Sequence, residues 1–127
     1  MDADRTAAPT RSTGARWEDA ALHHLQQNGL RLVARNFTCR FGEIDLVMRD
    51  RDRLVFVEVR FRDSDGHGGG TPSVGPAKRA KLTRAASLYL QAHPEFAQLP
   101  CRFDVVGCGG SLQAPAFDWT RAAFDAF

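Results

Sequence analysis

GEIDLVMRDRDRLVFVEVRF, residues 42–61, is the stretch of this sequence that decides the fold. Two runs rich in β-branched and aromatic residues lie on either side of a short polar segment at residues 50–52. This pattern predicts two antiparallel strands, residues 42–49 and residues 53–61, joined by a tight turn. The two strands are expected to lie in the core, because both are rich in apolar residues.

Acidic residues interrupt both apolar runs. Glu43 and Asp45 lie in the first and Glu58 in the second. Side chains alternate along a strand, so Glu43, Asp45 and Val47 are expected on one face and Ile44 on the other. Glu43 is expected to be hydrated at the strand's start, whereas Asp45 and Glu58 can converge across the strand pair. Because a buried carboxylate needs a compensating cation or strong donors, we expect the two acids to share a divalent metal ion.

The segments on either side of this hairpin predict an α/β fold. Hydrophobic periodicity and turn residues predict a mixed central sheet of about four to five strands flanked by two main helices. The helices are expected at residues 13–28 and 76–93, and the further strands at residues 30–37, 102–108 and, as a short edge, 116–119. The aromatic tail at residues 121–127 is expected to dock on the core.

The first predicted helix carries an inward-facing acid. Glu18 projects inside the apolar arc at about 100° per residue. An acid in that position again needs a partner. The residues that define the arc are Trp17, Ala20, Ala21, His24 and Leu25.

The second predicted helix is basic. Lys78, Arg79, Lys81 and Arg84 occur between residues 76 and 93, where no acid is found. Such a cluster near a helix N-terminus attracts anions, which indicates a face that binds nucleic-acid phosphates. A run of charge is more often simply a solvated face, and this alternative stays open.

The length and composition of the chain limit the classes of protein to which it can belong. The length of 127 residues predicts a single domain, residues 13–127, and the Ala, Thr, Pro, Arg and Ser content of residues 1–12 predicts a disordered tail. The net charge is +2. No apolar run is long enough to cross a membrane, and the N-terminus lacks the features of a secretory signal, so we expect a cytoplasmic protein. The odd number of cysteines, three, favours reduced thiols over disulfides.

The glycine-rich segment at residues 63–74 predicts a mobile loop. It contains His67-Gly68-Gly69-Gly70, which matches the oxyanion loop of lipases, and Ser73 follows nearby. A lipase nucleophile elbow requires Gly-x-Ser-x-Gly, and Thr71 stands at the first glycine position. We therefore interpret this segment as a flap beside the acids.

The sequence resembles the YraN family in the order of five features. These are the inward Glu18 of the first helix, the GEIDL strand, the FVEVR strand, the basic helix and the RFDVV strand. This is an uncharacterised bacterial family of restriction-endonuclease-like fold, and the resemblance spans residues 14–108. It implies a nuclease core around a D…(D/E)xK site. The helix acid is also similar to that of archaeal Holliday-junction resolvases.

The resemblance implies a role for each matching residue. Asp45 corresponds to the metal-binding aspartate, Glu58 to the second acid and Glu18 to the helix acid, and Arg60 occupies the position of the motif lysine. Mg²⁺ or Mn²⁺ would bind Asp45, Glu58 and the carbonyl of Val59. Arginine cannot serve as a base, so an amine from Lys78 or Lys81 is a candidate replacement.

We therefore expect a nucleic-acid-binding protein, and a metal-dependent endonuclease that hydrolyses phosphodiester bonds of structured DNA. It is expected to act as a homodimer, so that two strands can be cut symmetrically. The main alternative is a catalytically inactive nucleic-acid-binding module of the same fold, because Arg60 replaces the motif lysine. A third reading is a protein-interaction adaptor whose acids are purely structural.

Overall fold

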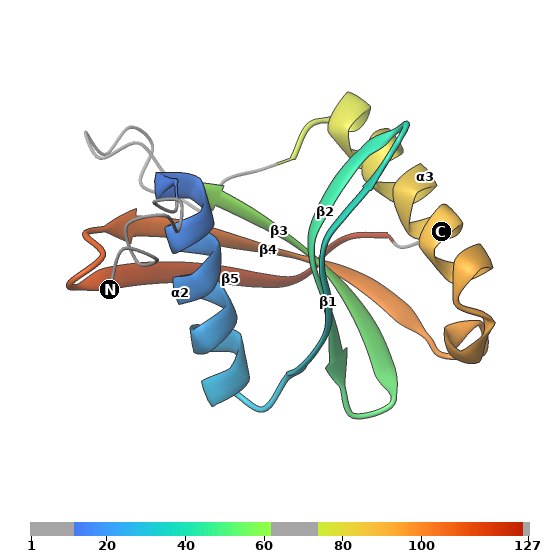
Figure 1. Ribbon diagram of the computed structural model, residues 1–127, viewed down its shortest axis with the longest axis horizontal. Helices are drawn as coiled ribbons and strands as arrows, with labels where there is room; N and C mark the ends of the chain where they lie inside the picture. The colour runs from blue at the N-terminus through green and yellow to red at the C-terminus, as the bar shows by residue number, and fades with distance from the viewer. Residues whose placement is uncertain (1–11, 62–73, 126–127) are drawn as a thin grey trace, which may run out of the picture.

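Five strands form one mixed sheet in the order β1-β2-β3-β4-β5, with helices on both sides of it (Figure 1). The computed structural model describes residues 12–61 and 74–125. Neighbouring strands are antiparallel except β3 and β4, which are parallel and connected through α3. The α/β class, the mixed sheet and the two flanking helices are confirmed.

The boundaries of the elements follow the predicted ones closely, with the largest difference at the last strand. The strand predicted at residues 53–61 begins and ends as expected. The elements in chain order are α2 Thr13–Gln27, β1 Arg31–Cys39, β2 Gly42–Asp50, β3 Arg53–Phe61, α3 Pro76–Ala92, the 3₁₀ helix η1 Pro94–Phe96, β4 Cys101–Gly110 and β5 Pro115–Phe124.

The sheet has a hydrophobic core on each face. Trp17, Ala21 and Leu25 of α2 pack on one face. The buried stripe of α3, formed as predicted by Leu82, Ala85, Ala86 and Tyr89, packs on the other. Burial of these two stripes accounts for the position of the helices, because most helix stability in proteins comes from packing of an apolar face.

Local signals set the ends of α2. Ser12 is the N-cap, and its Oγ accepts a hydrogen bond of 3.1 Å from the N–H of Ala15. After the C-cap Asn28, Gly29 has a φ of +95°, a conformation that suits glycine, so the predicted glycine stop holds. The predicted disordered tail at residues 1–12 lies outside the described residues except for Ser12.

The β1–β2 hairpin leaves the rest of the sheet at Leu46. Pairing between β2 and β3 ends at Leu46 opposite Val57, whereas pairing between β1 and β2 continues to Gly42. The free end of the hairpin bends toward α3 (Figure 1). Ile44 therefore joins Val47 in the core under α3, and the prediction that Ile44 lies on the opposite face from Val47 is wrong. Strict alternation fails because the hairpin twists away from its neighbour.

The last strand is longer than predicted, with ten residues, Pro115–Phe124. Asp104 of β4 is fully buried and holds it in place. The indole N–H of Trp119 donates to this carboxylate at 2.9 Å and the N–H of Ala122 at 3.0 Å. Phe124 stacks on Phe103 with ring centroids 4.6 Å apart, so this part of the predicted tail docks on the core.

Other predictions concern the cysteines, the loop and the membrane. Cys39, Cys101 and Cys108 are all reduced thiols. The predicted glycine-rich loop lies outside the described residues apart from Val74, which is buried under α3. None of the described helices is long and apolar enough to span a membrane.

Candidate functional site

The site begins where β2 separates from β3. Asp45 is the first β2 residue beyond the last pair with β3, and its Oδ2 accepts a hydrogen bond of 2.8 Å from the N–H of Val59. The carboxylate thus takes the acceptor role that a β2 carbonyl would have in a continued ladder. The N–H and C=O of one strand residue point toward the same neighbouring strand. The carbonyl of Val59, a predicted metal ligand, therefore faces the same side as Asp45.

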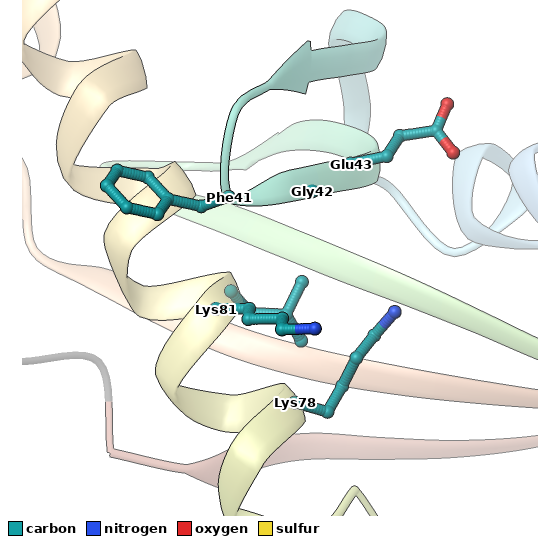
Figure 2. Close-up of a pocket in the computed structure, with 6 residues that line it drawn as sticks. Phe41, Gly42, Glu43, Lys78 and Lys81 are labelled. Carbon is teal, nitrogen blue, oxygen red and sulfur yellow. The ribbon is translucent and has the colours of Figure 1, made fainter.

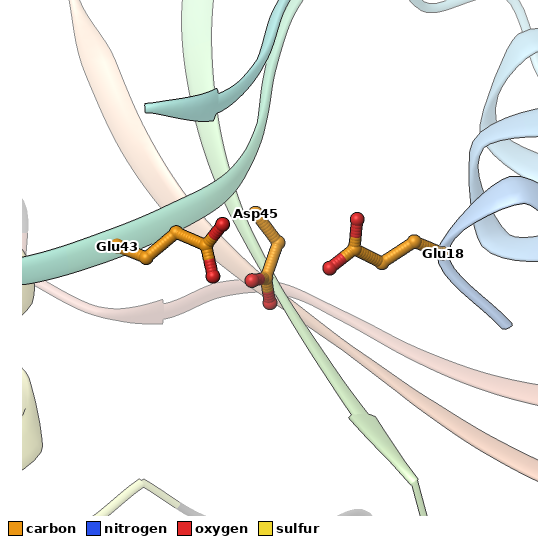
Figure 3. A group of neighbouring side chains, drawn as sticks. All are labelled: Glu18, Glu43 and Asp45. Carbon is orange, nitrogen blue, oxygen red and sulfur yellow. The ribbon is translucent and has the colours of Figure 1, made fainter. Parts of the chain in front are cut away.

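Three carboxylates converge at this point. Glu18 comes from α2, and Glu43 and Asp45 come from β2, with one oxygen of each within 4.8 Å of the others. Figure 3 shows the three groups pointing toward one another. Glu18 and Asp45 are partly buried, and Glu43 is exposed. We call these three side chains the acid cluster. Three negative charges at this spacing repel one another unless a proton or a cation is bound.

The electrostatics of Asp45 reflect this crowding. The pKa of Asp45 is raised from 3.8 to about 7, mainly by burial, next by the charge of Glu58, and to a smaller extent by the charges of Glu18 and Glu43. The hydrogen bond from the N–H of Val59 acts in the opposite direction. Near neutral pH the Asp45 carboxyl therefore exchanges readily between a protonated and an ionised form. A carboxyl poised in this way is typical of functional sites.

Glu58 joins the acid cluster from β3. Its side chain is only 8% exposed, and Oε2 lies 3.5 Å from Nζ of Lys78 on α3. Burial raises the pKa of Glu58, whereas Lys78, Arg60 and a hydrogen bond with Asp45 lower it. A hydrogen bond between two carboxyls requires that one member of the pair carries a proton. The predicted convergence of Asp45 and Glu58 is thus present, with Lys78 as an additional partner.

Glu18 also has structural partners. Its Oε1 accepts a hydrogen bond of 3.0 Å from the side-chain amide of Asn36 and lies 3.5 Å from the guanidinium of Arg35. Asn36 has a φ of 53°, a left-handed conformation that asparagine adopts more readily than most residues. Arg35 also pairs with Asp19 at 2.9 Å. Glu18 therefore helps to fasten α2 to β1 while its carboxylate faces the acid cluster.

The four basic residues predicted to bind nucleic acid separate into two groups. Lys78 and Lys81 line a pocket of about 170 Å³ together with Phe41, Gly42, Glu43 and Leu82 (Figure 2). Arg79 lies outside this lining. Its Nε donates a hydrogen bond of 2.7 Å to the carbonyl of Val74, and its guanidinium lies 5.6 Å from the ring of Phe124. Arg84 is not in the lining either, and its guanidinium lies 5.6 Å from the ring of Phe41.

Two residues that the sequence did not assign to the site, Glu43 and Phe41, lie at it in the structure. Glu43 was expected to be hydrated, and it is exposed, yet it belongs both to the acid cluster and to the pocket. Its position two residues before Asp45 in a strand was the available signal. Phe41 was not singled out. It lies in the turn between β1 and β2, and only the bend of the hairpin brings it to α3.

Comparisons with known proteins place this chain among a group of bacterial relatives. The family profile described as "Uncharacterised protein family UPF0102" matches residues 17–108. Similar proteins, each named as a UPF0102 protein, occur in several bacteria. One from Stutzerimonas stutzeri (strain A1501) is 50% identical over 116 residues, 91% of this chain and 97% of its own. One from Xanthomonas oryzae pv. oryzae (strain PXO99A) is 54% identical over 119 residues, 94% and 96% of the two chains.

A third relative, from Pseudomonas entomophila (strain L48), is 50% identical over 109 residues, which cover 85% of this chain and 89% of its own. The range matched by the family profile runs from α2 into β4. It therefore includes the acid cluster, Glu58 and both lysines of the pocket.

Proposed function

The chain belongs to uncharacterised protein family UPF0102, the YraN family, and we propose that it binds nucleic acid and hydrolyses phosphodiester bonds with the help of a divalent cation. The observation that carries this proposal is the convergence of the acid cluster with Glu58 and Lys78 where β2 leaves β3. The acids come from three elements, α2, β2 and β3, and meet in one place, although burial of each carboxylate lowers the stability of the fold.

The donor atoms fit a hard divalent cation. Every candidate ligand is an oxygen, which is the preference of Mg²⁺ and Mn²⁺. Asp45 is central, because it lies between Glu43 and Glu18 (Figure 3) and also interacts with Glu58. Asp45, Glu58 and the carbonyl of Val59 would hold the ion, and Glu18 and Glu43 would add negative charge to the same place.

The protein's own groups complete the chemistry. A bound cation would neutralise charge on the phosphate and make a coordinated water more acidic. Lys78 and Arg60 add positive charge beside Glu58, where negative charge develops on the phosphate oxygens during hydrolysis. Arg60 can serve only as a hydrogen-bond donor, because a guanidinium has no acceptor. The amine of Lys78, 3.5 Å from Glu58, supports the idea that α3 supplies the lysine that the motif position lacks.

The substrate class follows from charge and from the resemblance. Basic residues surround the acids, and the phosphates of nucleic acid carry regularly spaced negative charges that such residues can bind. The similarity of Glu18 to the helix acid of Holliday-junction resolvases favours branched or otherwise structured DNA. Action at such a substrate would suit a homodimer, and a cytoplasmic location would suit access to DNA. Sedimentation velocity across a range of protein concentrations tests the dimer.

The experiment that tests the proposal is a cleavage assay. Purified protein is incubated with labelled four-way junctions, flaps, single strands and duplexes in Mg²⁺, Mn²⁺ or EDTA. We expect cutting that requires metal and is lost in Asp45→Ala and in Glu58→Ala, while Asp52→Ala in the exposed β2–β3 turn cuts normally. Metal-dependent cutting that survives both site changes would show that the activity comes from elsewhere.

Arg60 at the motif lysine position favours a second candidate, a nucleic-acid-binding module without turnover. Salt-sensitive binding without cutting on any substrate would support this module over the enzyme. An adaptor whose acids are structural predicts a third pattern, in which Asp45→Ala alters stability but not retention of nucleic acid.

A further inference from the structure

The pocket lined by Lys78 and Lys81 lies directly beside the acid cluster. Glu43 lines the pocket and also belongs to the cluster, so the two share a wall. The carboxylate of Glu43 points away from α3 and toward α2 (Figures 2 and 3). The negative end of this side chain therefore serves the acid cluster, while the two amines of α3 remain the charged groups on the helix side of the pocket.

The helix side of the pocket suits a phosphate group. Lys78 and Lys81 are three residues apart and thus lie on one face of α3. Lys78 is 46% exposed while its amine lies 3.5 Å from Glu58, so the same amine can reach the pocket and the site. A backbone phosphate bound by Lys78 and Lys81 would therefore lie next to a phosphate bound at the acid cluster.

One aromatic side chain also lines the pocket. Phe41, in the turn between β1 and β2, is half-buried and lines the pocket. The guanidinium of Arg40 lies 4.8 Å from its ring centroid, and that of Arg84 lies 5.6 Å away. Both arginines are exposed. An aromatic ring with neighbouring guanidinium groups is the combination on which unpaired bases stack in proteins that bind single strands.

We propose that this pocket binds one unpaired nucleotide next to the scissile phosphate, with its phosphate on Lys78 and Lys81 and its base against Phe41. The proposal rests on the function proposed above and names the feature that selects the substrate. A base inside a duplex is covered on both faces by its neighbours, so it reaches Phe41 only when it is unstacked. The protein should therefore prefer strands with an unpaired nucleotide over continuous duplex.

Binding in EDTA tests this inference without any turnover. Fluorescence anisotropy measures the affinity of the full chain for a labelled single strand and for a duplex of the same sequence over a range of salt. We expect tighter binding of the single strand. A strand that contains 2-aminopurine reports stacking on Phe41 as a loss of its fluorescence.

Two variants separate the aromatic and the charged side of the pocket. Phe41→Ala should weaken single-strand binding about tenfold and abolish the 2-aminopurine quench without changing the salt dependence, whereas Phe41→Tyr should keep both. Lys81→Gln should reduce the slope of log K against log salt by about 0.7, which corresponds to one lost phosphate contact.

Matched controls lie far from the pocket. Phe96→Ala removes a half-buried aromatic ring at the other end of α3, and Arg53→Gln removes an exposed charge at the opposite end of β3. Both should bind like the unchanged protein, and thermal unfolding checks that every variant folds. Equal losses for duplex and single strand in Phe41→Ala, or no loss at all, would overturn the inference, as would an unchanged salt slope in Lys81→Gln.

The two proposals fail differently. Normal metal-dependent cutting with no effect of Phe41→Ala on single-strand binding would remove the nucleotide pocket and leave the nuclease intact. Single-strand binding that depends on Phe41, with no cutting of any substrate, would remove the nuclease and leave the pocket as the site of a binding module.

Discussion

At the scale of single residues, Asp45 shows how the site works against the stability of the fold. Its carboxyl is partly buried among three other acids, and its Oδ2 accepts a hydrogen bond of 2.8 Å from the N–H of Val59. The raised pKa means that the folded protein holds a proton that the unfolded chain releases above its ordinary value of 3.8. The free energy of unfolding therefore falls as pH rises from about 4 to about 7, and the full cost is present above that range.

Asp45→Asn should stabilise the metal-free protein at about pH 8 by about 1 kcal/mol, because the amide keeps an acceptor for Val59 and removes the charge. The gain should disappear below about pH 4, where Asp45 is protonated in both states. Urea unfolding at several pH values measures it. Asp52→Asn, in the exposed turn, is the control. A loss of stability at about pH 8 would contradict the account of Asp45.

Lys78 and Arg60 allow a test of which residue supplies the amine at the site. Lys78→Gln should reduce cleavage about 100-fold or more, a typical cost for removing a donor that stabilises developing charge. If Lys78 replaces the motif lysine, adding Arg60→Lys to that variant should restore part of the rate. Single-turnover kinetics on the best substrate measure both. A rate for Lys78→Gln equal to that of the unchanged protein would exclude this role.

At the scale of elements, one buried carboxylate fixes the position of β5. Asp104 accepts hydrogen bonds from Arg102 at 3.0 and 3.2 Å, and also from Trp119 and Ala122 of β5. Arg102 pairs in addition with Asp50 of β2 at 3.0 Å. This network links three strands, and every member has a partner, which is the condition under which a buried charge is tolerated.

Asp104→Ala should therefore destabilise the protein by about 3 kcal/mol or more, because it leaves the half-buried Arg102 and two N–H groups of β5 without their acceptor. Chemical unfolding measures the loss, and hydrogen exchange should show β5 opening before the other strands. Glu95→Ala, an exposed acid of η1, should change stability by less than about 0.5 kcal/mol. Uniform protection of all five strands in Asp104→Ala would contradict this role.

The bend of the β1–β2 hairpin is the element-scale feature that creates the pocket. Because β2 leaves β3 at Leu46, the turn that carries Phe41 reaches α3. Beyond Leu46, β2 no longer pairs with β3, and this separation leaves space for the acidic side chains of β2. The same departure moves Ile44 into the core under α3, so the bend is stabilised by apolar burial.

At the scale of the whole molecule, the proposed cation should act as a stabilising ligand. Four acids meet at one place, so an ion that binds the folded state alone raises its stability in proportion to the logarithm of its concentration. Saturating Mn²⁺ or Mg²⁺ should raise Tm by several degrees, and EDTA should reverse the shift. Glu43→Gln should reduce the shift, whereas Glu95→Gln should leave it unchanged. Equal shifts in wild type and in Asp45→Asn would place the ion elsewhere.

Much of this protein could be predicted from its sequence. Local patterns predicted both helices, the β2–β3 hairpin and the inward position of Glu18, because periodicity and turn residues act over a few neighbours. The length of β5 could not be predicted, since it depends on Asp104, a residue of another strand. The separation of Arg79 from the two lysines likewise depends on Val74 and Phe124, which come from distant parts of the chain.

The order of elements and the placing of acids in apolar strands were thus determined by the sequence itself, because alternation and helical spacing are local. Tertiary structure alone decided which charges meet. Glu43 joins Glu18 and Asp45, and Lys78 reaches Glu58, only after the hairpin bends and α3 packs against it. The physical reason is that electrostatic interactions depend on distances in space, and these are set by the packing of elements that are far apart in the chain.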